Sequence, residues 1–184
     1  MNNSPAEDIK LLHEGKWLRL VKRGRWEWCE RTHSALGLAV QVIAVTPDDR
    51  VLFVEQYREA LGASAIEMPA GLVGDDDDND TIEAAARREL IEETGWEPGH
   101  VEVLVGGPTS AGMSNERIVM VRARDLRQVG AGGGVGGENI IVHAIPRADA
   151  PAWLMQKHAE GYALDLKLWA GLWMIDRNPD GSPA

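Results

Sequence analysis

The sequence predicts a mixed α/β fold in which a mixed sheet is sandwiched between helices. Apolar strand-type segments recur along the chain, the first long one at residues 38–45 and the last at residues 140–145. Segments of helical character stand between these strands and after them, at residues 81–94, 150–158 and 164–174. A chain of 184 residues is long enough for one domain with a substantial core, alone or with a small appendage.

The N-terminal part is expected to be a loose tail, residues 1–12, followed by two strands at 16–21 and 26–31 that are joined around Gly24. A two-stranded hairpin is marginally stable by itself. This strand pair also has more tryptophans than an exposed hairpin needs. The pair must therefore dock either on a partner chain or on the chain's own core. The tryptophans are Trp17, Trp26 and Trp28.

The strand predicted at 38–45 is interrupted only by Gln41. A turn at 47–49 leads back into a second strand at 51–56. After the first helix, further strands are expected at three places along the chain. These are residues 101–105, 118–122 and 140–145.

The helix at 81–94 has signals at both ends. Asp80 is a good N-cap, and Glu83 follows three residues later as in a capping box. Three alanines in the first turns favour the helix. Gly95 is suited to the residue that ends it in a left-handed conformation.

Two late features have structural interpretations. The glycine-rich segment 130–137 lacks the Lys-Ser/Thr of a P-loop, so it predicts a flexible loop and not a phosphate cradle. Trp169 and Trp173 lie one turn apart in the last helix, which indicates packing in the core or at an interface.

Bulk composition limits the classes of function. The net charge is −10, with 29 acidic and 19 basic residues, which argues against binding to nucleic acid or to an anionic membrane. One cysteine, Cys29, allows no intrachain disulfide and suits a reducing compartment. Neither a signal peptide nor a transmembrane run is visible, so a soluble cytoplasmic protein is expected.

Three glutamates of the predicted helix lie on its apolar side. At about 3.6 residues per turn, Glu89, Glu92 and Glu93 fall on the side of Ala85, which should face the core. A solvated acidic helix is the alternative, but the position of the glutamates on the apolar side argues against it. Ionised carboxylates buried on that side are very unfavourable unless they are paired or bind metal. Mg²⁺ is therefore expected, with Mn²⁺ as the alternative, together with a substrate that carries phosphates. Arg88 is expected to pair with Glu92 one turn later.

Residues 88–96, which read R-E-L-I-E-E-T-G-W, resemble the second half of the Nudix box, G-x5-E-x7-R-E-U-x-E-E-x-G-U, in full. Two glycines fit the start of the box. Gly74 has the family's spacing to Arg88, with Asp80 in place of the family glutamate. Gly71 requires a short insertion, but residues 67–72 resemble the segment before the box in ADP-ribose and sugar-nucleotide pyrophosphatases, which favours Gly71.

The resemblance covers about residues 16–175 and implies the fold and the domain organisation. A Nudix-type α/β/α sandwich with a mixed sheet is expected over residues 36–184. Residues 1–35 are expected to form the tail and a small antiparallel strand pair. In the resembling pyrophosphatases an N-terminal sheet docks on the partner subunit, so a homodimer is implied here.

The resemblance also implies roles in a metal-dependent hydrolysis. Glu89, Glu93 and the carbonyl of Ala70 would be metal ligands, and Glu92 a further ligand or a base. Arg88 would orient these glutamates. Glu138, which stands before a late strand, would activate the attacking water from a loop that closes over the substrate.

The implied substrates are nucleoside-diphosphate sugars, including ADP-ribose, which would be cleaved to a nucleoside monophosphate and a sugar phosphate. ADP-ribose-specific members usually carry S-P-G where residues 110–112 read S-A-G, which weakens ADP-ribose as the sole substrate. Trp26 or Trp28 would stack on the base. The expected substrate-binding residues are Arg58, Tyr57, Trp26, Trp28, Glu67, Ser110 and Met113.

Two rival functions remain open. One is a nucleoside triphosphate pyrophosphohydrolase of the same family, which the N-terminal strand pair and residues 67–71 argue against. The other is a non-catalytic nucleotide-sugar sensor, which the complete set of box glutamates argues against. Release of pyrophosphate from a triphosphate would support the first, and ligand binding without turnover the second.

Overall fold

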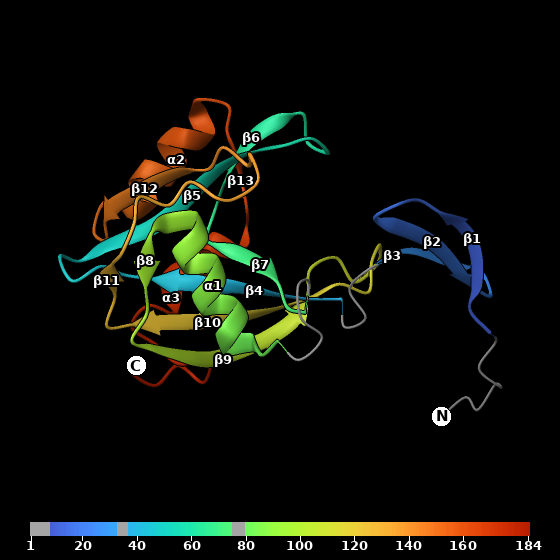
Figure 1. Cartoon of the computed structure of the whole chain (residues 1–184), viewed down its shortest axis with the longest axis horizontal. Helices are drawn as coiled ribbons and strands as arrows, with labels where there is room; N and C mark the ends of the chain where they lie inside the picture. Colours follow the sequence, from blue (N-terminus) through green and yellow to red (C-terminus); the bar gives the residue numbers. More distant parts are fainter. Residues whose placement is uncertain (1–7, 33–36, 75–79) are drawn as a thin grey trace.

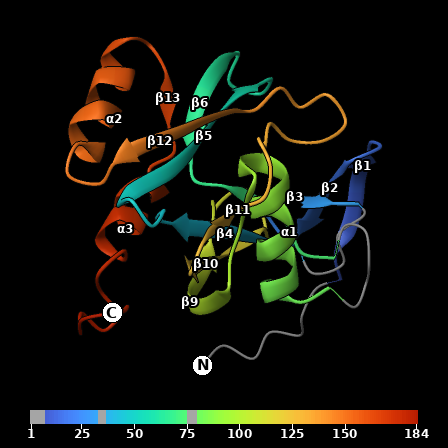
Figure 2. The same cartoon turned by 60° about the vertical axis from the view of Figure 1, so that its left-hand side comes forward.

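The computed structural model describes residues 8–32, 37–74 and 80–184. Two four-stranded sheets form its centre, and a three-stranded sheet stands to one side of them (Figure 1). Helix α1 covers one side of the central sheets, while α2 and α3 lie on the other (Figure 2). The predicted mixed α/β fold, with sheet between helices, is confirmed, although the central strands are divided between two sheets.

The first central sheet has the strand order β7-β4-β10-β9. β4 and β10 are parallel and the outer pairings are antiparallel, so the sheet is mixed. β4 is apolar on both faces, as suits a strand that is covered on both sides. The strands are β4 (Leu38–Ala44), β7 (Ala70–Leu72), β9 (His100–Pro108) and β10 (Arg117–Arg124).

The second central sheet has the order β12-β5-β6-β13. β5 and β12 correspond to the strands predicted at 51–56 and 140–145, whereas β6 and β13 were not predicted. A separate two-stranded ladder, also not predicted, joins β8 (Trp96–Glu97) to β11 (Arg127–Gln128). The strands of the second sheet are β5 (Arg50–Arg58), β6 (Ala63–Glu67), β12 (Ile141–Pro146) and β13 (Ala163–Leu164).

The N-terminal sheet has three strands, β1 (Lys10–Glu14), β2 (Leu18–Arg23) and β3 (Trp26–Arg31). The predicted strand pair is present as β2 and β3. A third strand, β1, pairs with β2, so the prediction of a loose tail is wrong for residues 10–12. Trp17 and Trp26 are 63% and 65% exposed, so these two do not pack on the chain's own core.

The N-terminal sheet is tied to the rest of the chain by residues 113–116. The backbone N–H of Cys29 donates to the carbonyl of Met113 at 2.9 Å. Arg31 forms an ion pair of 2.7 Å with Glu116. The domain boundary predicted near residue 35 falls within 33–36, which lies outside the described residues. The run Asp75 to Asp78 also lies outside them.

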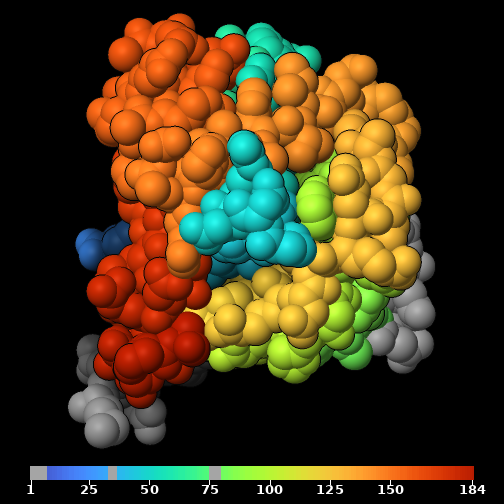
Figure 3. Space-filling model, turned by 90° about the vertical axis from the view of Figure 1, so that its left-hand side faces the viewer, coloured from blue at the N-terminus to red at the C-terminus, as the bar shows by residue number. Residues whose placement is uncertain are grey.

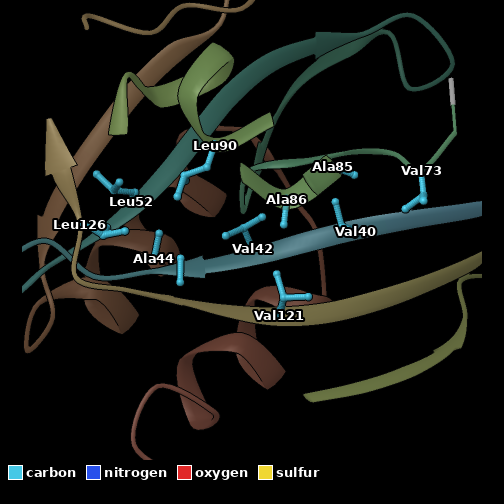
Figure 4. Packing of buried hydrophobic residues seen from close by; sticks show 11 residues of the cluster. Val40, Val42, Ala44, Leu52, Val73, Ala85, Ala86, Leu90, Val121 and Leu126 are labelled. Atoms are coloured by element: carbon cyan, nitrogen blue, oxygen red, sulfur yellow. The ribbon is translucent and has the colours of Figure 1, made fainter. Parts of the chain in front are cut away.

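Two clusters of buried apolar residues hold the central layers together. In the first, Val40 and Val42 of β4 point toward Ala86 and Leu90 of α1 (Figure 4). The second lies beneath the other two helices and is built around Phe53. Since alternate residues of a strand point to opposite faces, strand β4 contributes to both clusters, with Val42 in the first and Ile43 in the second.

Helix α1 (Ile82–Thr94) is capped by Thr81, whose hydroxyl accepts a hydrogen bond from the N–H of Ala84 at 3.1 Å. The prediction that Asp80 is the N-cap is therefore wrong, because the helix begins one residue later and a threonine hydroxyl serves the same purpose. Gly95 ends the helix in a left-handed conformation, with φ of 76°, as predicted.

The late helices are α2 (Ala150–Ala159) and α3 (Lys167–Trp173), and Figure 3 shows them, in orange and red, on one face of the molecule. α3 begins later than predicted because residues 163–164 pair with β6. Trp169 and Trp173 are 37% and 43% exposed, so the core-packing interpretation is wrong for this pair. Within the described residues, none of the helices has the length and apolar character needed to span a membrane.

Candidate active site

Helix α1 places its glutamates at the edge of the core. Ala85, Ala86 and Leu90 are fully buried and fix the rotation of the helix against the sheets. Glu93 lies on the same side and is only 5% exposed, as the periodicity predicted. Glu89 is half-buried, so two of the predicted carboxylates are held where the core meets a cleft.

Glu93 is the most deeply buried carboxylate of this group. The backbone N–H of Ala70 donates to its Oε2 at 3.0 Å. Burial raises the pKa of Glu93 to about 8, and the nearby charges of Glu89 and Glu138 add to this, while the Ala70 hydrogen bond opposes it. Glu93 thus loses its proton less readily than an exposed glutamate.

Glu89 has a similar environment with one added cation. Its Oε1 accepts a hydrogen bond from Arg88 at 2.6 Å. Burial raises the pKa of Glu89 to about 7. The attraction of Arg88 opposes this shift, but repulsion from Glu92 and Glu138 adds to the effect of burial, so the pKa stays above its ordinary value. Two neighbouring carboxyl groups with raised pKa values are typical of functional sites.

Arg88 connects the start of the box to its helix. Its guanidinium donates to Glu89, to Asp80 at 2.9 Å and to the carbonyl of Leu72 at 3.2 Å. The predicted pairing of Arg88 with Glu92 is present only as a charge interaction. The hydrogen bonds of the guanidinium go to Glu89 and Asp80, which lie within reach of its fork. Asp80, expected as a helix cap, instead anchors Arg88.

Gly71 lies directly against the Glu89 carboxyl group. A Cβ atom built on Gly71 would overlap that carboxyl group, whereas the loop glycine Gly74 has a positive φ of 78°. The backbone of β7 therefore approaches the glutamate as closely as a residue without a side chain allows. This contact supports Gly71 as the glycine that begins the box.

Replacing Gly71 with alanine is expected to displace the Glu89 side chain while leaving the fold intact, because the displaced atoms are the end of a flexible side chain. Affinity for a divalent cation should fall by about tenfold or more, the scale seen when groups around a metal site are disturbed. Isothermal titration with Mn²⁺ measures this. Gly107→Ala is the control, since a Cβ there meets no atom within 4 Å; equal Mn²⁺ affinity in the two variants would contradict the prediction.

A cleft of about 480 Å³ opens in front of Glu89 and Glu93. Six residues predicted from the sequence meet there: Arg58, Glu67, Ala70, Glu89, Glu93 and Glu138. The other lining residues come from the N-terminal sheet, from both central sheets, from the segment between β9 and β10 and from the segment that begins α3. They are Arg31, Ala39, Gln41, Gln56, Gly71, Leu72, Thr109, Glu116, Ile118, Asp165 and Lys167.

The remaining predicted residues lie outside the lining of this cleft. Trp26 and Trp28 line a second hollow of about 340 Å³, together with residues 111–112 and 114–115. Tyr57 and Met113 are exposed, at 58% and 67%. The others that do not line the cleft are Ser110, Arg88 and Glu92.

Arg58 faces the cleft but does not present an unpaired charge. Its guanidinium donates to both carboxylate oxygens of Glu67, at 2.6 and 2.7 Å. This pairing, opposed by desolvation, raises the pKa of Arg58 above its already high value. A bidentate pair of this kind fixes the plane of the guanidinium, so the position of the cation is set before any ligand arrives.

Three polar residues that also line the cleft, Gln41, Asp165 and Lys167, were not predicted. Asp165 accepts hydrogen bonds from Gln41 at 3.2 Å and from the Lys167 ammonium group at 2.7 Å. Gln41 is fully buried, in agreement with its position inside an apolar strand. The sequence did not show which residue it would contact. No local pattern connects residues that are 124 positions apart.

Glu138 reaches the cleft from the segment between β11 and β12. Its carboxylate accepts a hydrogen bond from the backbone N–H of Val135 at 3.0 Å. It is also close enough to Glu89 and Glu93 to raise the pKa of both. Glu138 therefore belongs to the same group of carboxylates, although it is more than forty residues from α1 in sequence.

The donor set fits a hard divalent cation. Within residues 8–32, 37–74 and 80–184, no three His, Cys, Asp or Glu side chains converge as a ready-made metal site. Glu89 and Glu93 instead turn to Arg88 and to the Ala70 N–H. Their oxygens are the ligand type that Mg²⁺ prefers. Burial raises the pKa of both in spite of the nearby arginines, so a bound cation would offset the cost of their negative charge.

Comparison with known proteins gives a family and a fold. The family model described as NUDIX domain matches residues 35–132. The chain is 41% identical over 88 residues to the methanol dehydrogenase activator of Bacillus methanolicus, covering 48% of this chain and 46% of that protein. It is 31% identical over 133 residues to the ADP-sugar pyrophosphatase of Mus musculus, covering 61% and 59%.

A solved structure described as an ADP compounds hydrolase has a TM-score of 0.64 to this chain at 17% identity, covering 84% of this chain and 92% of that one, which shows a shared fold. The matched regions span about half the length of the curated relatives. The family model, in contrast, covers more than half of this chain and includes the whole of α1 with the residues around it. The chain therefore belongs to the NUDIX domain family.

Proposed function

We propose that this chain hydrolyses the diphosphate bond of nucleoside-diphosphate sugars, including ADP-ribose, to a nucleoside monophosphate and a sugar phosphate. The observation that carries the proposal is the cleft in which Glu89, Glu93 and Glu138 meet beside Arg58. The mouse relative is described as an ADP-sugar pyrophosphatase and the structural neighbour as an ADP compounds hydrolase, and both descriptions agree with this substrate class.

A divalent cation, Mg²⁺ or Mn²⁺, would be held by Glu89, Glu93 and the carbonyl of Ala70, with Glu92 as a further ligand or base. When bound, such an ion neutralises phosphate charge and polarises the P–O bond. Arg88 fixes the rotamer of Glu89 through its 2.6 Å hydrogen bond, and its contact with Asp80 fixes Arg88 in turn. Arg88 thereby acts as a positioning residue.

The transfer of the proton and the binding of the phosphates are assigned to side chains of the protein. Water attacks one phosphorus of the diphosphate, and the bridging oxygen leaves with the other phosphoryl group. Glu138 accepts the proton of the attacking water, because its carboxylate lines the cleft and is not paired with a cation by any hydrogen bond in the described residues. Arg58, held by Glu67, places positive charge against the phosphates.

The N-terminal sheet, within the separate unit proposed for residues 1–35, is proposed to dock on a second copy of the chain. Trp17 and Trp26 are exposed, and Leu11 and Leu18 of the same sheet are 57% and 52% exposed, which is an unusual amount of apolar surface for a small sheet. Docking would bring the hollow lined by Trp26 and Trp28 to a substrate base. The single cysteine suits the proposed cytoplasmic location.

Sedimentation equilibrium tests the homodimer. The wild-type protein is expected at twice the mass of one chain, and Trp26→Glu at the mass of one chain, because a charge in an apolar interface is unfavourable. Trp173→Glu, on the exposed side of α3, is the control and should remain dimeric. A monomeric wild-type protein would rule the homodimer out.

A product assay tests the activity. Purified protein with Mg²⁺ is mixed with ADP-ribose, ADP-glucose, GDP-mannose, UDP-glucose and nucleoside triphosphates, and the products are separated by chromatography. Monophosphate from the sugar nucleotides, lost on adding a chelator, is the expected result. Pyrophosphate released from triphosphates would instead support a triphosphate pyrophosphohydrolase, and binding without turnover a sensor.

A further inference from the structure

The glycine-rich segment is folded against the C-terminal end of α1. The N–H groups of Gly133 and Gly134 donate to the carbonyls of Glu93 and Glu92, at 2.9 and 3.0 Å. Figure 2 shows the chain that links β11 to β12 passing over this end of the helix, and Figure 3 shows the same segment, in gold, beside the green of the helix region. The last carbonyls of a helix have no partner within it, so this segment caps α1. Residues 133–134 of the predicted loop are therefore hydrogen-bonded to the end of the helix.

The cap requires glycine at residue 132. Its φ is 70°, in the left-handed region that favours glycine. A Cβ atom built on Gly132 would lie 2.5 Å from the carbonyl oxygen of Glu93 and closer still to the backbone of Thr94. Because these neighbours are backbone atoms, they have little freedom to move aside.

The same segment closes into a short loop that carries Glu138. The N–H of Ile140 donates to the carbonyl of Gly133 at 3.1 Å, which ties the two ends together. Inside the loop, the Val135 N–H donates to the Glu138 carboxylate at 3.0 Å, and the Glu138 N–H donates to the Val135 carbonyl at 3.2 Å. Glu138 is thus attached, through few bonds, to the helix end that bears Glu92 and Glu93.

Gly134 leaves space for the Glu138 side chain. A Cβ atom built on Gly134 would lie 2.5 Å from Oε2 of Glu138, 3.0 Å from its Cβ and 2.9 Å from Cδ1 of Ile140. The carboxylate is the end of a flexible side chain, so an added methyl group would push it away without unfolding the loop. The missing side chain at this position allows the observed direction of the carboxylate.

We propose that Gly132 and Gly134 are positioning residues for Glu138. Gly132 lets the loop cap the carbonyls of Glu92 and Glu93, and Gly134 lets the Glu138 carboxylate turn into the cleft. The distance between Glu138 and the carboxylates of α1 is therefore set by the backbone of the cap. The catalytic part of this inference rests on the proposed function, in which Glu138 accepts the proton of the attacking water.

Gly134→Ala and Gly136→Ala form a matched pair for the test. Both glycines have a positive φ, 80° and 61°, so alanine strains the backbone at each. Only at Gly134 does the added methyl group meet Glu138, since a Cβ at Gly136 meets nothing within 4 Å. Against ADP-ribose with Mg²⁺, Gly134→Ala should lower kcat at least about tenfold with KM little changed, because a general base contributes about 10²- to 10⁴-fold. Gly136→Ala should stay close to wild type, and equal kcat in the two variants would overturn the proposal.

A second background separates positioning from a general loss of structure. In Glu138→Gln protein, Gly134→Ala should lower kcat no further, because the group on which it acts is already disabled. A further tenfold loss there would show that Gly134 acts by another route and would overturn the proposal. So would a Glu138→Gln variant with wild-type kcat.

Amide hydrogen exchange measured by NMR tests the cap without any activity. The amides of Gly133 and Gly134 should exchange slowly, and that of Gly136, which has no hydrogen-bond partner in the described residues, should exchange fast. Gly132→Ala should remove the protection. Fast exchange at Gly133 and Gly134 in the wild type would overturn the cap itself. Protection in a protein that hydrolyses no sugar nucleotide would leave the cap standing and locate the failure in the proposed function.

Discussion

Replacing Glu93 with glutamine is expected to reduce turnover by at least about 100-fold, because a catalytic cation contributes several kcal/mol to the transition state. Glutamine has nearly the same size, and its carbonyl oxygen can still accept the hydrogen bond from the Ala70 N–H. The fold should therefore remain intact. Steady-state kinetics with ADP-ribose at saturating Mg²⁺ measures the loss.

The same substitution should make the metal-free protein more stable at pH 8.5. Glu93 is 5% exposed and its pKa is raised to about 8, so above this pH the wild type carries a charge that burial disfavours. A neutral amide removes that cost, which is on the order of a few kcal/mol at 1.4 kcal/mol per pKa unit. Thermal melting in EDTA should show a higher Tm for the variant, and Mg²⁺ should raise that Tm less than it raises the Tm of the wild type.

Glu83→Gln is the matched control, since this residue lies on the exposed side of the first turn of the same helix. It should keep wild-type turnover and wild-type stabilisation by Mg²⁺. Near wild-type turnover in Glu93→Gln would remove Glu93 from the proposed ligand set.

The part of the site that could be predicted from sequence consists of residues with a recognisable local pattern, above all those of α1. Glu89 and Glu93 are brought to the same side by the helical period alone, and Gly71 was selected by a short local resemblance. Arg58 and Glu138 were also expected near the phosphates, and both line the cleft. Local spacing was enough in these cases because each residue stands next to a recognisable element.

Long-range contacts account for most of what was missed. Gln41 and Asp165 meet only because β4 lies inside one sheet and α3 begins beneath it, a relation that no local pattern records. The short strands β6 and β7 were missed because their partners, β5 and β4, decide their structure. The Arg88 partner was assigned by helical spacing, but Asp80, outside the helix, offers better geometry.

The stability of the metal-free protein is expected to fall as the pH rises from about 5 to about 8. The pKa values of Glu89 and Glu93 are raised in the folded state to about 7 and about 8, above the 4.5 of the unfolded chain. Over this range the unfolded chain has already lost these protons while the folded protein still holds them, so each rise in pH favours unfolding. Their contribution is fully present below about pH 4.5 and is lost above the folded pKa values.

A divalent cation should reverse this trend, because it binds the deprotonated carboxylates and releases their protons. In urea unfolding at a fixed Mg²⁺ concentration, the gain in stability over EDTA should be large at pH 8.5, about 2.7 kcal/mol if Mg²⁺ is a hundredfold above its Kd. At pH 6 the gain should be small, since both protons must leave before the ion can bind. The difference between wild type and a Glu89→Gln, Glu93→Gln double variant isolates the contribution of these two groups. A gain from Mg²⁺ that is the same at both pH values would show that neither glutamate is a ligand, because only groups that exchange a proton for the metal make its affinity depend on pH in this range.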